Sequence, residues 1–137
     1  MKREKLQAEA KRFLQKWQKQ LFLRGWNFEL VFNEEAPPAN ENAMCYVSVS
    51  PEYMEATVFV NPSYYTAPND VREHAICHEL CHCHTQQLWN LAGYLLDGRL
   101  VTDRELRETT EKLTQQIAYI AMQDKWPQRR SIPRRSR

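Results

Sequence analysis

The sequence predicts one α+β domain over residues 1–126, followed by a basic tail over residues 127–137. An amphipathic helical pattern comes first, three short β-rich runs follow it, and two further helical patterns close the domain. The 137 residues suffice for one domain with its own hydrophobic core. We expect the N-terminal helix to pack on a small, mostly antiparallel three-stranded sheet.

The N-terminal helix is predicted over residues 4–23, because apolar residues recur there at helical spacing with Lys and Gln between them. Gly25 is placed to act as its C-cap. The apolar positions are Leu6, Ala10, Phe13, Leu14, Trp17 and Leu21.

Three strands are predicted next. Residues 26–32 alternate between large apolar and polar side chains, which is typical of a half-buried strand. A loop over 33–42 with two prolines separates it from the β-rich runs 43–50 and 54–60. Residues 56–60 of the last run are β-branched and apolar, and we expect them to form an exposed sheet edge that could bind an extended peptide. The alternative is an inner strand that is paired on both sides.

Two helices are predicted after the strands. Asp70 and Glu73 form a capping-box pattern before a helix that carries residues 75–89 or extends beyond them, and a loop over about 93–101 follows. A second capping box, Thr102 with Glu105, predicts the start of the last helix. We expect that helix to cover residues 103–124.

Composition limits the classes of function. The net charge is +2, and no apolar run is long enough to span a membrane. The charged N-terminus has no signal-peptide core, so we expect a cytoplasmic protein without membrane contact. The tail concentrates arginine, which favours an acidic partner and suggests weak nucleic-acid contact.

The motif that carries chemistry is His78-Glu79-Leu80-Cys81-His82, an HExxH sequence inside a predicted helix. Residues four apart lie one turn apart on the same helix face, so His78 and His82 can bind one Zn²⁺ together. Glu79 lies beside the metal, where it can take a proton from a zinc-activated water and pass it to a leaving amine.

A catalytic zinc usually has three protein ligands and one open position. No histidine follows His84, and Thr85 and Leu88 occupy positions that would be Gly and His in the metzincin pattern. The third ligand is therefore expected to be a carboxylate. The candidates are Glu105, Glu108 and Glu111 on the last helix, with Asp97 and Asp103 as weaker choices.

The segment AICHELCHCH, followed by ETTEKLTQQIAYIA, resembles short single-domain zincins that are often found in phages and prophages. It is similar to minimal gluzincins of the ImmA/IrrE-like or SprT-like kind over about residues 26–120. In the ImmA/IrrE-like group a ligand Glu heads a pattern that Glu111, Thr114, Ile117 and Ala118 match. The resemblance thus implies a zincin-like fold with Glu111 as the third ligand and Glu108 as second choice.

Four cysteines stand at positions 45, 77, 81 and 83. Three of them lie among histidines, which suits reduced thiols better than a disulfide framework. Cys77 and Cys81 are four apart and could form a second soft metal pair, with His74 one turn before His78. The simpler interpretation is that small cysteine side chains fill the packed face of the helix. His84 is expected to be a surface or packing residue.

These observations lead to the interpretation of the protein as a zinc metallopeptidase that acts on a peptide or protein substrate. The zinc is bound by His78, His82 and Glu111, and Glu79 is the general base. The alternative is a non-catalytic, zinc-stabilised module that binds a protein or nucleic-acid partner. A structural zinc site needs no general base at position 79.

Overall fold

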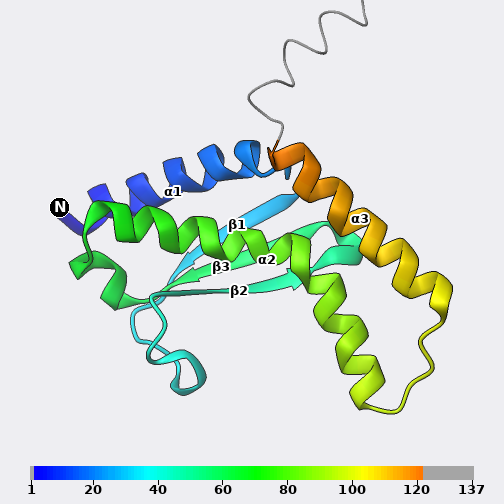
Figure 1. Cartoon of the computed structure of the whole chain (residues 1–137). Coiled ribbons are helices and arrows are strands. Elements are labelled where there is room, and N and C mark those ends of the chain that lie inside the picture. Colours follow the sequence, from blue (N-terminus) through cyan, green and yellow to red (C-terminus); the bar gives the residue numbers. More distant parts are fainter. Residues whose placement is uncertain (1, 122–137) are drawn as a thin grey trace, which may run out of the picture. The chain divides into compact units, whose positions relative to one another are not determined.

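The structure of the protein is a computed structural model that describes residues 2–121. Within this range it contains three α-helices and one three-stranded sheet, which confirms the α+β class (Figure 1). The elements are α1 Lys2–Gln20, β1 Asn27–Phe32, β2 Cys45–Ser50, β3 Glu55–Val60, α2 Asn69–Leu96 and α3 Asp103–Ala121.

The described chain divides into two compact units, which are treated separately. The first ends at Gln86 and holds α1, the sheet and most of α2, whereas the second begins at Gln87 and holds α3. The single domain over 1–126 stays a prediction. The basic tail and residues 122–124 of the expected last helix lie outside the described residues.

Helix α1 ends at Gln20, five residues before the predicted glycine cap. The cap is Phe22, which takes a left-handed φ of 58°. Its N–H donates to the Lys19 carbonyl at 3.2 Å, and the Leu23 N–H donates to the Gln18 carbonyl at 2.8 Å, the pattern of a Schellman motif. Gly25 as C-cap is therefore wrong, and a Cβ there would meet Met54 Cε at 3.0 Å.

The sheet has the order β1-β3-β2. β2 and β3 form an antiparallel hairpin, closed by a turn in which Met54 has a φ of 54° and donates its N–H to Pro51 O. β3 then pairs in parallel with β1. The prediction of a mostly antiparallel sheet is wrong, because the hairpin returns β3 into the space between β2 and β1 and makes one of the two pairings parallel.

Strand β3 is the central strand and not an exposed edge. Its residues pair with β1 on one side and with β2 on the other, so its main-chain groups are used within the sheet. The side chains of Ala56, Val58 and Val60 are buried, with at most 5% of their surface exposed. The expectation that residues 56–60 bind a peptide is therefore wrong, and the edges of the sheet are β1 and β2.

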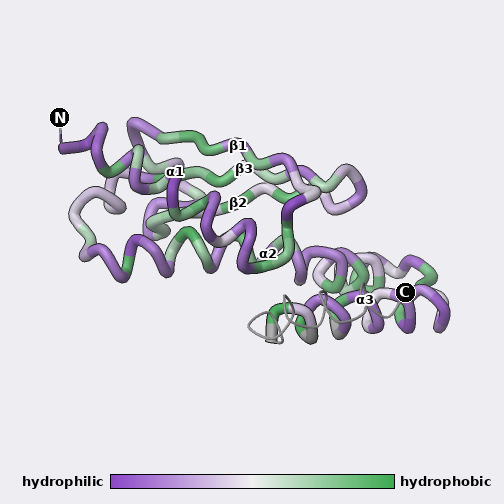
Figure 2. Tube along the Cα trace, turned by 90° about the horizontal axis from the view of Figure 1, so that it is seen from above, coloured by the Kyte–Doolittle hydropathy of each residue, from purple (hydrophilic) through white to green (hydrophobic). Residues whose placement is uncertain are grey.

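Helices α1 and α2 cover one face of this sheet (Figures 1 and 2). The strands are largely hydrophobic, whereas hydrophobic residues form bands along the helices (Figure 2). The bands follow from the helical period, which returns a side chain to the same face every third or fourth residue. The buried helix residues are Ala10 and Leu14 of α1 and Ile76, Leu80 and Cys83 of α2.

Helix α2 begins at Asn69 and runs without interruption to Leu96. The Arg72 N–H donates to the Pro68 carbonyl at 2.9 Å, so the helix starts one residue before Asp70 and the predicted Asp70 capping box is wrong. The predicted loop over 93–101 also begins too early, because residues 93–96 still belong to the helix. The helix ends in a second Schellman motif, with Gly98 at a φ of 76° and Arg99 N–H donating to Tyr94 O.

In the second unit, the Glu105 N–H donates to the Thr102 hydroxyl at 3.1 Å, which confirms Thr102 as the N-cap of α3. No helix in the described part of the chain combines the length and apolar character that crossing a membrane requires.

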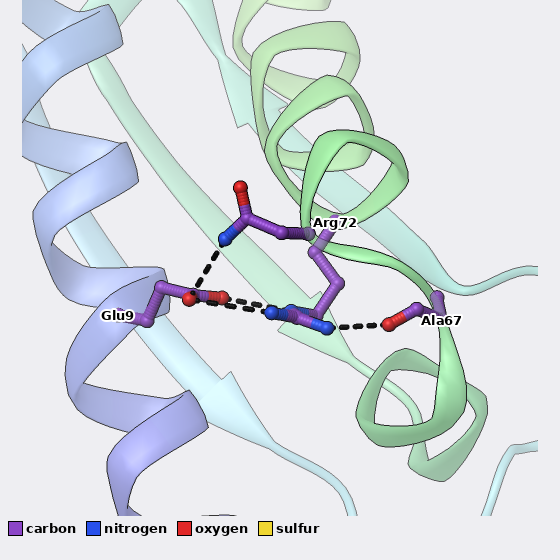
Figure 3. Close-up of polar contacts among 4 residues, drawn as sticks. Glu9, Ala67 and Arg72 are labelled. Carbon is purple, nitrogen blue, oxygen red and sulfur yellow. Dashed lines mark hydrogen bonds and ion pairs between the residues drawn. The ribbon is translucent and has the colours of Figure 1, made fainter.

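An ion pair joins α1 to the start of α2 (Figure 3). Arg72 Nε donates to Glu9 Oε1 at 2.7 Å and Arg72 Nη2 donates to Glu9 Oε2 at 3.3 Å, while Asn69 adds a bond of 3.0 Å to the same carboxylate. Arg72 Nη1 also donates to the carbonyl of Ala67. Both charged side chains are mostly buried, with 11% of Arg72 and 17% of Glu9 exposed. The hydrogen bond to Glu9 is the main cause that raises the pKa of Arg72.

Replacing Arg72 with Ala is expected to lower the free energy of unfolding by about 3 kcal/mol or more, because Glu9 would be left buried without its partner. Arg104→Ala breaks the exposed pair with Glu108 and serves as control, with an expected change of about 0.5 kcal/mol or less. Urea unfolding measures both. Additive losses for Glu9→Ala and Arg72→Ala in the double variant would contradict the pairing.

Candidate metal centre on helix α2

The two histidines of the HExxH motif lie on the solvent side of α2. His78 and His82 are both exposed, and their ring centroids are 5.1 Å apart with the rings nearly perpendicular at 80°. Burial lowers the pKa of His82, and the neighbouring His78 lowers it further. A neutral imidazole is the form that binds a metal. The pair therefore fits a divalent metal in donor type and spacing.

Glu79 points to a different environment from that of its two neighbours. It is one of the few buried charged residues, with 9% of its surface exposed, and burial raises its pKa to about 7. Helix geometry explains the difference, because successive residues are turned by about 100° around the axis. His78 is exposed, and the rotation by one residue directs Glu79 toward the packed side of α2, where Ile76 and Leu80 are fully buried.

The first residue of strand β2 lies within electrostatic reach of Glu79. Cys45, the first residue of β2, is buried, and burial raises the pKa of its thiol to about 12, with the charge of Glu79 as the second cause. Cys45 is thus a neighbour of the candidate general base that sequence reasoning did not find. The alternation of side chains along a strand is a sequence signal that could have placed Cys45 on the packed face of the sheet. No pattern in the sequence indicates that this residue lies near α2.

Two residues of α2, Glu73 and His84, contact α1 and the segment that follows it. Glu73 accepts hydrogen bonds from Trp17 Nε1 at 2.8 Å and Lys16 Nζ at 2.5 Å, both on α1. The Lys16 bond, followed by the Trp17 bond, lowers the pKa of Glu73. His84 Nε2 lies 2.7 Å from the carbonyl oxygen of Leu21. His84 is therefore a packing residue, as the sequence indicated, and Glu73 ties the helices together where the sequence suggested a cap.

His74 extends the row of histidines by one turn. Its ring centroid is 6.2 Å from that of His78, and the side chain is exposed. Residues 74 and 82 are two turns apart, about 12 Å along the axis, so the three imidazoles cannot share one ion. His74 is a neighbour of the pair and not a third ligand of the same metal.

All the carboxylates considered as the third ligand belong to the second unit. Glu111 is an exposed residue of α3. Glu108 accepts from Arg104 at 2.9 Å, and Asp103 accepts from Arg107 at 3.1 Å, so these two are engaged within α3. Over residues 2–121, no three His, Cys, Asp or Glu side chains gather closely enough to hold an ion. The two histidine ligands lie together in the first unit, whereas Glu111 belongs to the second, and its role as ligand stays a prediction.

Comparison with known proteins adds no further assignment, since no family model, curated protein or solved structure matches this chain.

The buried position of Glu79 has a consequence for stability in metal-free protein. With its pKa raised to about 7, folded protein keeps a proton that the unfolded chain loses near pH 4.5, so stability falls as pH rises through this window. Glu79→Gln removes the ionisation. In the presence of a chelator, the variant should therefore exceed the wild type in stability at pH 8 by on the order of 3 kcal/mol.

Urea unfolding at pH 4.5 and pH 8 measures the effect. The advantage of the variant should shrink as the pH approaches 4.5, because wild-type Glu79 is then protonated in the folded protein and only about half ionised in the unfolded chain. An equal difference at both pH values would show that the carboxylate is not held in an apolar environment.

Proposed function

We propose that the protein is a zinc-dependent metallopeptidase of the zincin type, with a catalytic centre built on α2. The observation that carries the proposal is the division of the HExxH segment between two environments. Two imidazoles 5.1 Å apart face the solvent, and the carboxyl between them is buried with a pKa raised to about 7. A general base needs a pKa close to the working pH.

Bound zinc would act as a Lewis acid that makes a water acidic and polarises the scissile carbonyl. Each residue of the chain then has a defined task. His78 and His82 hold the ion through neutral ring nitrogens. Glu79 accepts the proton of the attacking water and delivers it to the leaving amine. Its buried carboxyl favours the protonated form after the first transfer, which prepares the second.

The third ligand is proposed to be Glu111, on the resemblance to ImmA/IrrE-like zincins, with Glu108 as second choice. Two features favour Glu111. It is exposed on α3, and it forms no ion pair with any residue that the structure describes, whereas Glu108 is paired with Arg104. Two histidines with one glutamate are a known ligand set of catalytic zinc.

Zinc content tests the ligand set. The wild type is expected to bind one zinc per chain, and His78→Ala or His82→Ala should lose stoichiometric zinc after dialysis, because each removes one of two adjacent donors. His74→Ala is the matched control, since it removes an exposed imidazole one turn away and should keep full zinc. Glu111→Gln should weaken binding more than Glu108→Gln. Full zinc in the His78→Ala, His82→Ala double variant would overturn the site.

Catalysis is tested by Glu79→Gln in zinc-loaded protein. The variant should keep its zinc and its fold while turnover of a proteome-derived peptide library falls by about 10²–10⁴-fold, the usual contribution of a general base. Glu29→Gln, an exposed carboxylate of β1, is the control and should keep full activity.

Two outcomes would contradict this mechanism. Cleavage that survives Glu79→Gln unchanged would mean that another group moves the proton. A zinc-loaded wild type that cleaves no peptide of the library would favour the alternative of a non-catalytic, zinc-stabilised binding module.

A further inference from the structure

The four cysteines fall into two classes in the structure. Cys45 and Cys83 are buried, as expected for small side chains that fill a packed interface. Cys77 is half-buried and Cys81 is exposed. The packing interpretation therefore holds for the first two and fails for Cys81, because an exposed thiol fills no core.

Cys77 and Cys81 form a pair on successive turns of α2. The two side chains are one helical turn apart on the same side of α2, close enough for each thiol to influence the pKa of the other. They have the same four-residue spacing as His78 and His82. Each cysteine precedes one of these histidines by one residue, which is about 100° around the helix axis. The pair thus occupies a strip of α2 beside the histidines and closer to α1.

The surroundings of the pair are polar and charged. Lys16 and Glu73, which are joined by a hydrogen bond of 2.5 Å, lie near enough to Cys77 to influence its pKa in opposite directions. The Lys16 ammonium is therefore placed to offset part of the negative charge of a metal-bound thiolate pair.

We propose that Cys77 and Cys81 form a binding site for a soft monovalent cation of the Cu(I) class, separate from the HExxH histidines. Thiolates select soft metals, and Cu(I) is satisfied by two sulfur donors, whereas zinc prefers four ligands. No third metal-binding side chain joins the pair within residues 2–121. Binding forms two Cu–S bonds and releases the two thiol protons, with no change of oxidation state.

The test supplies Cu(I) as its bicinchoninate complex, without oxygen, to the full chain. Loss of the coloured complex should show transfer of one Cu(I) per chain to the wild type. Cys77→Ser and Cys81→Ser should each weaken retention by at least about tenfold, since a single thiolate gives up the chelate. Bound Cu(I) should also protect both thiols together from alkylation, as read by mass spectrometry.

Matched controls separate this site from its neighbours. Cys83→Ala removes a buried thiol from the same helix and should retain one Cu(I), as should the His78→Ala, His82→Ala double variant. Circular dichroism confirms that each variant is folded, and alkylation protection in the wild type needs no variant at all. The proposal is overturned if the wild type takes up no Cu(I), if either serine variant retains it fully, or if the double histidine variant abolishes uptake.

Discussion

The ion pair between Glu9 and Arg72 is the constraint on which the rest of the first unit depends. Arg72 lies in the first turn of α2 and is held by the Glu9 carboxylate and by the Ala67 carbonyl. Since each residue of a helix is turned by about 100° from the one before, the direction of Arg72 sets the direction in which the following residues of α2 in the first unit leave the helix axis. The burial of Ile76 and Leu80 then follows from packing on the sheet.

The candidate centre results from this fixed rotation of α2. Contacts from Glu73 to α1 and from His84 to the Leu21 carbonyl hold the same helix farther along. Between these contacts, Glu79 is turned toward the packed side while His78 and His82 face the solvent. Burial raises the pKa of Glu79, whereas the same burial would be costly for a metal ligand that must stay accessible. One helix therefore presents two chemical environments within five residues.

The position of β3 is a second consequence of packing. Its residues are the most β-branched of the three strands, and such a segment gains most when it is covered on both edges and by helices on one face. The hairpin with β2 places β3 beside β1, where the pairing becomes parallel. Strand β2 is left as an edge, and its first residue, Cys45, lies near Glu79.

The sequence by itself determined the element types and the chemistry of the motif. Apolar spacing indicated the helices and alternation indicated the strands, since both patterns are local. The HExxH spacing required His78 and His82 to share a face on any helix. Local patterns also placed Thr102 at the start of α3.

Only the tertiary structure decided which strand is central, because pairing joins residues far apart in the chain and alternation does not state an order. The tertiary structure also placed the cap of α1 at Phe22 and not at the nearby Gly25. The left-handed backbone of Phe22 is stabilised by the hydrogen bonds of the Schellman motif. In the same way, Glu73 resembles a capping residue in sequence but bonds to Trp17 of another helix. The burial of Glu79 and the exposure of Cys81 were decided by which side of α2 packs on the sheet, and this depends on long-range contacts that no local pattern contains.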